Sequence, residues 1–319
     1  TMGSGLACFD FDNDGWLDVF FANGTRWPGR PGRTTYSALY HNNRDGTFSD
    51  VTRQAGLAVE MFGIGVAAAD YDNDGFVDLY VTAIGGNHLF RNLGDGRFAD
   101  VTVQSGTRGP GTFGTSTMFF DYDRDGRLDL IIANYVTWTV EQDLFCTLDG
   151  KTKSYCTPES YKGESATLFR NLGDGRFEDA TREAGLWDPT SKALGVALLD
   201  HDNDGWPDFV LANDTQPNKL YRNNRNGTFS DIGMTAGIAY GETGVARAGM
   251  GVDAADYSGS GRSGLLFANF SNEMIGLYYN EGEGLYVDEA PASIVGRASM
   301  LTLAFGIFFF DYDLSLIHI

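Results

Sequence analysis

One pattern, Asp-x-Asp-x-Asp-Gly-x-x-Asp, occurs four times in this chain. The copies span residues 10–18, 70–78, 121–129 and 200–208. Calcium in proteins takes about six to eight oxygen ligands, which a loop supplies from carboxylates at alternate positions, with a glycine at its sharpest bend. The spacing of the pattern meets that need, so it predicts four calcium loops.

Each loop would assign its ligand positions in the same way. Positions 1, 3, 5 and 9 supply carboxylates, and position 7 supplies only its backbone carbonyl, so its side chain is free to vary. The predicted ligands are Asp10, Asp12, Asp14, Trp16 and Asp18; Asp70, Asp72, Asp74, Phe76 and Asp78; Asp121, Asp123, Asp125, Arg127 and Asp129; and Asp200, Asp202, Asp204, Trp206 and Asp208. The sequence therefore predicts about four Ca²⁺ ions as cofactors.

These loops differ from EF-hands, which need a bidentate Glu at position 12 between two helices. Position 12 here is Phe21, Val81, Ile132 or Leu211, in segments rich in β-branched and aromatic residues that indicate strands. The simpler alternative is a set of surface turns, because Asp and Asn side chains bond their own backbone. Repetition in one register favours metal binding instead.

A fifth copy of the loop has lost most of its acids. It reads Asp256-Tyr-Ser-Gly-Ser-Gly, so Asp256, Ser258 and Ser260 form a weak metal set at best. A sixth copy begins at Asp311 as Asp-Tyr-Asp and stops there.

A second motif alternates with the loops and predicts a hairpin. It begins at Leu39, Leu89, Leu168, Leu220 and Leu277, and its turns are Asp-Gly, Asn-Gly or Glu-Gly pairs between apolar runs. Together with the strands on either side of each calcium loop, the hairpin completes a unit of four antiparallel strands. Repeated units of this kind predict an all-β fold, a β-propeller of four-stranded blades.

The combined motifs resemble the FG-GAP and VCBS repeat families, seen in integrin α-chain propellers and in bacterial surface proteins. Phe62-Gly63 and Phe305-Gly306 match the Phe-Gly approach of those repeats. The pattern Tyr-Arg-Asn-x-x-x-Gly-x-Phe-x-Asp is most similar to the cartilage acidic protein group, whose members commonly carry a C-terminal ASPIC/UnbV domain. The resemblance implies about seven blades, of which five and the first strand of a sixth are expected here.

The repeats predict one domain over residues 1–313, which we expect to be truncated at both ends. Residues 314–319 depart from the repeat, where a third acid and a glycine are due. We expect this tail to be foreign or frame-shifted sequence, with a native edge strand as the alternative.

Composition narrows the partners and the compartment. The net charge is −20, from 43 acidic and 23 basic residues, and an acidic chain without a basic stripe is a poor nucleic-acid binder. No apolar run is long enough to span a bilayer.

Cysteine usage indicates the compartment. Cys146 and Cys156 are close enough in sequence to predict a disulfide, with free thiols as the alternative, and hence a secreted, periplasmic or cell-surface protein. We expect Cys8 to be a small core residue. The four histidines are scattered and show no zinc spacing.

Two long connections indicate where a ligand could bind. Both join a second to a third strand, so they should lie at the end of the blades opposite the calcium loops. The predicted ligand face consists of Arg26, Trp27, Arg30 and Arg33 in the first insertion and Trp138, Tyr155 and Tyr161 in the second. Arginine and aromatic side chains are common anchors of recognition, although both segments could be tolerated surface insertions.

Two functions fit this pattern. The first is a calcium-stabilised extracellular binding or adhesion module that recognises a protein or glycan without catalysis. The second is a polysaccharide lyase or hydrolase. Its candidate catalytic acids, near the predicted ligand face, are Glu60, Glu141, Glu159 and Glu164. The sequence lacks Gly-x-Ser-x-Gly, His-Glu-x-x-His and a P-loop, which favours the binding module.

Overall fold

The repeats fold as separate four-stranded sheets in the computed structural model, which describes residues 5–26, 32–109 and 113–311. The sheets of the first two repeats are β1 (Leu6–Phe9), β2 (Asp18–Phe21), β3 (Ala38–Asn42) and β4 (Phe48–Asp50), and β5 (Phe62–Ala69), β6 (Asp78–Ile84), β7 (His88–Asn92) and β8 (Phe98–Asp100). The third is β9 (Gly114–Phe120), β10 (Asp129–Asn134), β13 (Thr167–Asn171) and β14 (Phe177–Asp179). The last two are β15 (Ala193–Leu199), β16 (Asp208–Asn213), β17 (Lys219–Asn223) and β18 (Phe229–Asp231), and β19 (Gly249–Ala255), β20 (Gly264–Asn269), β21 (Gly276–Gly282) and β22 (Leu285–Asp288).

Few other elements accompany the sheets in the described part of the chain. They are a two-stranded ribbon of β11 (Cys146–Thr147) and β12 (Lys153–Ser154), the short helices α1 (Thr102–Ser105) and α2 (Ile294–Ser299), and a 3₁₀ turn at Pro158–Ser160.

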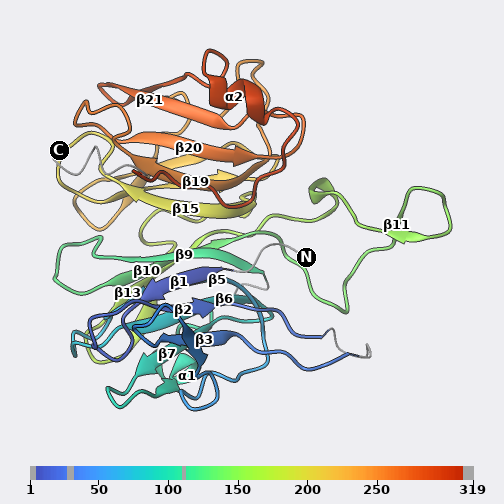
Figure 1. Cartoon of the computed structure of the whole chain (residues 1–319). Coiled ribbons are helices and arrows are strands. Elements are labelled where there is room, and N and C mark those ends of the chain that lie inside the picture. The colour runs from blue at the N-terminus through green and yellow to red at the C-terminus, as the bar shows by residue number, and fades with distance from the viewer. Residues whose placement is uncertain (1–4, 27–31, 110–112, 312–319) are drawn as a thin grey trace.

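Each sheet keeps its strands in chain order, and neighbouring strands are antiparallel (Figure 1). The register places each Asp-rich loop between the first and second strands and each Gly turn between the third and fourth. This is the blade topology expected from the repeats, so the prediction of an all-β propeller fold is confirmed.

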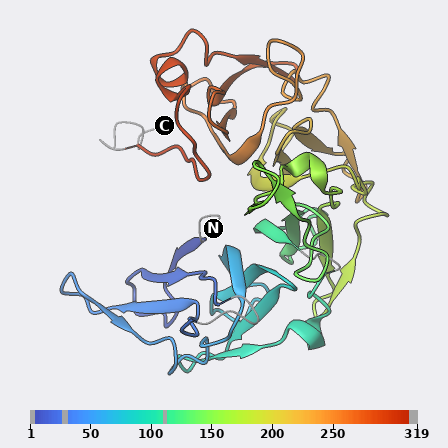
Figure 2. The ribbon, with the colours of Figure 1, turned by 90° about the vertical axis from the view of Figure 1, so that its right-hand side faces the viewer.

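Successive blades pack through their first strands. β1 lies beside β5, β5 beside β9, β9 beside β15, and β15 beside β19. The blades follow one another along an arc that stays open in Figure 2, with the N-terminal strand and the C-terminal segment on either side of the opening.

Glycines allow this close approach of the first strands. A Cβ atom on Gly65 would lie 2.0 Å from the backbone oxygen of Thr115, and one on Gly251 would lie 2.2 Å from that of Phe305. The pairing of β5 with β6 also shifts register between Gly63 and Val66. The glycine-rich approach to each loop is therefore a packing requirement between neighbouring blades.

The hydrophobic core is divided into layers between adjacent blades. Phe20 of the first blade packs in one cluster with Leu79 and Phe90 of the second, and these side chains are almost completely buried. Phe120 and Ile131 of the third blade likewise share a cluster with Phe209 of the fourth. Each blade therefore depends on its neighbours for burial of its faces.

The structure differs from two expectations at the ends of the arc, the first strand of a sixth blade and the burial of Cys8, whereas the tail at 314–319 lies outside the described residues and its prediction stays untested. Residues 303–310 form no strand pairs, but they lie beside β19, where the Phe309 amide donates to Asp253 Oδ2 at 2.7 Å and its ring stacks on Tyr257. Cys8 lies in β1 but is exposed. Side chains alternate along a strand, and Phe9 takes the face that the second blade covers, so Cys8 points to the uncovered face of the first blade.

Candidate metal loops and the opposite face

The first aspartate of each loop holds the turn itself. Asp10 Oδ1 accepts from the Asp14 amide at 3.0 Å, and Asp10 Oδ2 accepts from the Gly15 amide at 2.7 Å. The eroded fifth loop keeps this arrangement, since Asp256 accepts from the amides of Ser260 and Gly261. The aspartate at position 5 also accepts from the amide at position 7, as Asp14 does from Trp16 at 2.9 Å. Turn formation therefore accounts for positions 1 and 5 in part and leaves the acids at positions 3 and 9 to be explained.

The aspartate at loop position 9 anchors each loop to the third strand of its own blade. In the second blade, Asp78 is fully buried, and its two oxygens accept from the amides of Asn92 at 2.7 Å and Tyr71 at 3.2 Å. Burial raises the pKa of Asp78 to about 7, and the same cause raises the pKa of Asp129 to about 7. A nearby divalent cation would favour the charged form of both carboxylates.

The aspartates at loop positions 3 and 5 face basic side chains, most of which come from the third strand or from the turn that follows it. Arg91 Nε lies 2.6 Å from Asp72, and Arg91 Nη2 lies 3.0 Å from Asp74. The corresponding pairs are Asp123 with Arg170, Asp125 with Arg127, Asp202 with Arg222, Asp204 with Arg225, and Asp14 with Arg44. In the fifth repeat, serines replace these acids and Tyr279 stands where Arg91 stands in the second. Acid and base have thus been lost together.

The donor set of the full loops fits a hard cation. Carboxylate oxygens of Asp70, Asp72 and Asp78 lie within 4.8 Å of one another. The same holds for Asp10, Asp12 and Asp14, and for Asp121, Asp123 and Asp129. Oδ1 of Asp72 and Oδ1 of Asp123 are buried and have no hydrogen-bond partner within the described residues. A buried carboxylate oxygen needs a compensating donor or cation, and calcium prefers oxygen ligands.

Two histidines join these groups, although the sequence spacing assigned them no metal role. His201 is buried, with Nδ1 2.7 Å from Asp208 Oδ2, and His41 Nδ1 lies 3.3 Å from Asp18 Oδ1. His41 occupies the position that Arg91 holds in the second repeat. Alignment of the repeats would therefore have revealed it.

In the second to fifth blades, a buried asparagine that the sequence did not single out joins the blade to the metal loop of the preceding blade. Asn92 Nδ2 donates to the backbone oxygens of Phe11 at 2.8 Å and Val77 at 3.1 Å. Equivalent bonds run from Asn171 to Tyr71, from Asn223 to Tyr122, and from Asn280 to His201. The asparagine that follows arginine in the hairpin motif was the sequence signal that could have revealed this bond.

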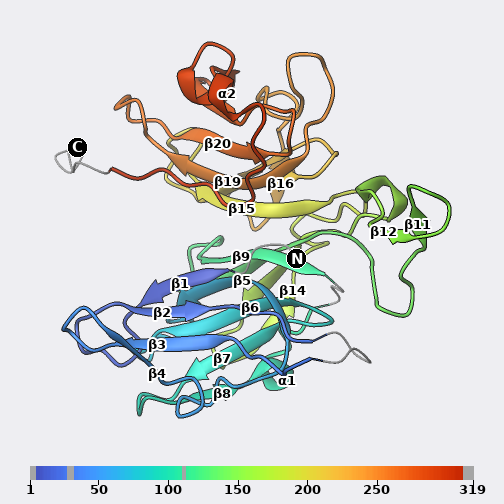
Figure 3. The same ribbon diagram turned by 45° about the vertical axis from the view of Figure 1, so that its right-hand side comes forward.

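The insertions project from the opposite end of the blades (Figure 3). Arg26 and Arg33 are exposed, and Tyr155 is 93% exposed. Trp27 and Arg30 lie outside the described residues. Trp138 and Tyr161 are half-buried. The indole N–H of Trp138 donates to Asp143 at 3.1 Å, and the Tyr161 hydroxyl donates to the same carboxylate at 3.4 Å.

A disulfide joins Cys146 to Cys156 across the β11–β12 ribbon, with a Cα–Cα distance of 5.2 Å. It closes the tip of the second insertion, outside the blade cores. Among the described residues, no helix combines the length and the hydropathy needed to cross a membrane.

The repeats match a known family model described as FG-GAP-like repeat. The matches cover residues 10–81, 70–132, 142–211 and 200–267. Those that start at residues 10, 70 and 200 begin at the first aspartate of an Asp-rich loop. The chain belongs to the FG-GAP-like repeat family. Membership confirms the resemblance inferred from the loops and hairpins.

The curated relatives of this FG-GAP-like chain are cartilage acidic proteins. Cartilage acidic protein 1 of Homo sapiens is 26% identical over 230 residues, covering 68% of this chain and 31% of the relative. The Xenopus tropicalis protein is 26% identical over 239 residues, covering 72% of this chain and 34% of the relative. The chain thus spans about a third of the length of the relatives it matches.

Solved structures with partial likeness to this chain are more distant. A lectin of Agrocybe aegerita described as recognising non-reducing terminal N-acetylglucosamine is 18% identical, with a TM-score of 0.47 over 90% of this chain and 65% of the lectin. The biofilm matrix protein Bap1 of V. cholerae is 13% identical, with a TM-score of 0.43 over 89% of this chain and 38% of that protein.

Proposed function

We propose that this FG-GAP-repeat chain is a calcium-stabilised binding module of an extracellular or cell-surface protein, which recognises a protein or a glycan and catalyses no reaction. The observation that carries the proposal is the pair of buried, unpartnered carboxylate oxygens of Asp72 and Asp123 inside acidic loops. Such oxygens favour a cation site over an ordinary turn.

Calcium would act on stability. The carboxylates of each full loop repel one another, and the nearby arginines neutralise only part of their charge. The predicted Asp ligands and the position 7 carbonyl would hold the ion at the end where the first and second strands join. Binding to the folded state alone stabilises that state by mass action.

The remaining parts of the proposal rest on the second insertion. A disulfide is typical of proteins in oxidising compartments, and Cys146–Cys156 is formed here. Tyr155, on the same ribbon, is almost fully exposed. An exposed aromatic on a cross-linked loop can contact a partner at little entropic cost.

A two-part experiment tests this function. Isothermal titration with calcium should show about four tight sites, and EDTA should lower the melting temperature until calcium is restored. A glycan and extracellular-protein array should show binding that Tyr155→Ala weakens without changing the melt. A melt insensitive to calcium would overturn the metal role.

The same array separates the module from the polysaccharide enzyme. Bound glycans are incubated with the chain, and reducing ends and unsaturated products are measured. Binding without turnover supports the module. Turnover that is lost in Glu141→Gln or Glu159→Gln would support the enzyme instead.

A further inference from the structure

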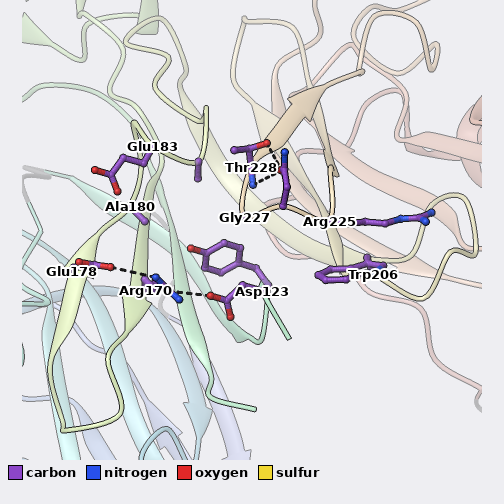
Figure 4. Close-up of a pocket in the computed structure, with 12 residues that line it drawn as sticks. Asp123, Arg170, Glu178, Ala180, Glu183, Trp206, Arg225, Gly227 and Thr228 are labelled. Carbon is purple, nitrogen blue, oxygen red and sulfur yellow. Dashed lines mark hydrogen bonds and ion pairs between the residues drawn. The ribbon is translucent and has the colours of Figure 1, made fainter. Parts of the chain in front are cut away.

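A cavity of about 420 Å³ lies in the groove between the third and fourth blades (Figure 4). One wall carries Arg170 and Glu178, with Glu183 close by in the segment after β14. The other wall carries Trp206 and Thr228, from the fourth metal loop and the turn between β17 and β18. We call this space the third groove.

The other repeats give an internal comparison for the third groove. Ala180 in its floor corresponds to valine or isoleucine in three other repeats, namely Val51, Val101 and Ile232. Each groove lies between one blade and the next blade along the chain, and Thr228 at the rim belongs to the second blade of its pair. In the other pairs, the residue at this position is Arg97, Arg176 or Leu285. Smaller side chains on both sides open the space.

The walls also carry charge that the other repeats lack. Glu178 corresponds to Ser49, Ala99 and Ser230, and Glu183 corresponds to Gln54, Gln104 and Thr235. Only the third repeat places carboxylates at both positions. A groove that is both widened and acidified in one repeat indicates a feature that blade packing alone does not require.

The basic residues nearby compensate this charge only in part. Arg170 Nε lies 3.0 Å from Asp123 of the metal loop, whereas its Nη1 lies 3.8 Å from Glu178. Arg225 pairs with Asp204 of the fourth loop. Within the described residues, no hydrogen bond or ion pair engages the carboxylate of Glu183.

An aromatic side chain completes the lining. Trp206 is half-buried, and the guanidinium carbon of Arg124 lies 4.8 Å from its ring centroid. The indole therefore already attracts one cation from within the chain. Tryptophan is the strongest cation–π partner among the side chains.

We propose that the third groove binds a guanidinium or alkylammonium group, presented by a basic side chain of a partner protein. Glu178 and Glu183 would accept charge-assisted hydrogen bonds from its N–H groups. The formal charge of −20 would favour the approach of a basic partner. The groove is separate from the face that carries Tyr155, so this inference does not depend on the ligand proposed for that face.

Four small probes test the cation and its source. Calcium-saturated chain is titrated with Gly-Arg-Gly and with the neutral peptide in which citrulline replaces arginine, and binding is followed by NMR of the indole N–H signals. Glucosamine and N-acetylglucosamine form a second charged and neutral pair. Gly-Arg-Gly should bind about tenfold or more tightly than the citrulline peptide, should bind more tightly than glucosamine, and should weaken with salt.

Variants that restore the sequence of other repeats locate the site. Thr228→Arg installs the arginine of the second and third repeats, and it should abolish peptide binding. Thr47→Arg, at the matching turn of the first blade, is the control and should bind normally. Glu183→Gln installs the glutamine of the first two repeats and should weaken binding about tenfold, with Glu242→Gln, an exposed glutamate outside the groove, as its control.

Three results would overturn the inference. They are equal binding of the arginine and citrulline peptides, unchanged binding by folded Thr228→Arg, and tighter binding of either amino sugar than of Gly-Arg-Gly. Unfolding of Thr228→Arg would leave the decision to Glu183→Gln, an exposed and nearly isosteric change. Normal binding by Glu183→Gln would then also overturn the assignment.

Discussion

The side-chain amide of Asn13 donates to the backbone oxygen of Gly75 at 2.9 Å, and this bond joins the metal loop of the first blade to that of the second. Asn73 donates to Gly126, Arg124 to Gly205, and Asn203 to Gly261. In each case position 4 of one loop reaches the glycine of the next. The loops therefore form one hydrogen-bonded series along the arc, which includes the eroded fifth loop.

Position 4 makes this bond from a left-handed backbone conformation. Asn13 has φ 58° and Arg124 has φ 59°. Asparagine tolerates this region better than most residues do, and the turn aims its side chain toward the next blade. The buried asparagines of the third strands add a second set of links below the loops.

The first prediction concerns those buried links. Asn92→Ala should destabilise the chain by about 2–3 kcal/mol, because it leaves the oxygens of Phe11 and Val77 without their donor. Asn43→Ala is the control, since Asn43 makes an exposed bond to Thr47, and should cost less than about 1 kcal/mol. Urea denaturation with calcium present measures both. Equal losses would refute a structural role for the interblade bond.

The second prediction converts one full loop into the pattern of the fifth. Asp72→Ser, Asp74→Ser and Arg91→Tyr together remove acid and base at once, so no unpaired arginine remains. Calcium titration of this variant should show one tight site fewer than the parent. At calcium levels about a hundredfold above the dissociation constant, the variant should lose about 2.7 kcal/mol of calcium-dependent stability. An unchanged number of sites would contradict the ligand assignment.

The third prediction tests the contact between first strands. Gly65→Ala should cost about 1–3 kcal/mol or more, because the new methyl group would meet the Thr115 oxygen. Gly306→Ala is the matched control, since nothing lies within 4 Å of a Cβ there. Thermal melts of the two variants should therefore separate. Similar melting temperatures would show that the strands can move apart.

The fourth prediction concerns the disulfide. Cys146→Ser with Cys156→Ser should leave the main melting transition almost unchanged, because the β11–β12 ribbon lies outside the blade cores. The insertion itself should become easier to cleave, since its cross-link no longer restricts the loop. Limited proteolysis with mass spectrometry locates the cuts. A large drop in the global melt would show that the insertion supports the blades.

Local features of the chain were open to prediction from the sequence because they depend on neighbouring residues. Glycine and aspartate spacing defines the turns, and apolar alternation defines the strands. The repetition of both identified the blade as the unit. The short spacing of Cys146 and Cys156 in the sequence was also enough to predict their disulfide.

The failures all involve contacts between distant residues. Cys8 has the composition of a core position, but its exposure depends on whether another blade covers that face. That coverage is not visible in the strand pattern. The indole of Trp138 donates to Asp143, and its place in the predicted ligand face stays a prediction.

The sequence by itself determined the repeat, the strand order within a blade and the acidic loops, because hydrogen bonding and side-chain alternation within one repeat are enough to specify them. Only the tertiary structure decided how the repeats meet. The bond from Asn92 to Phe11 spans 81 positions, and the third groove combines Glu178 with Trp206 from the next blade. Such pairs arise because each blade buries its faces against another blade, and that packing selects which polar groups become partners.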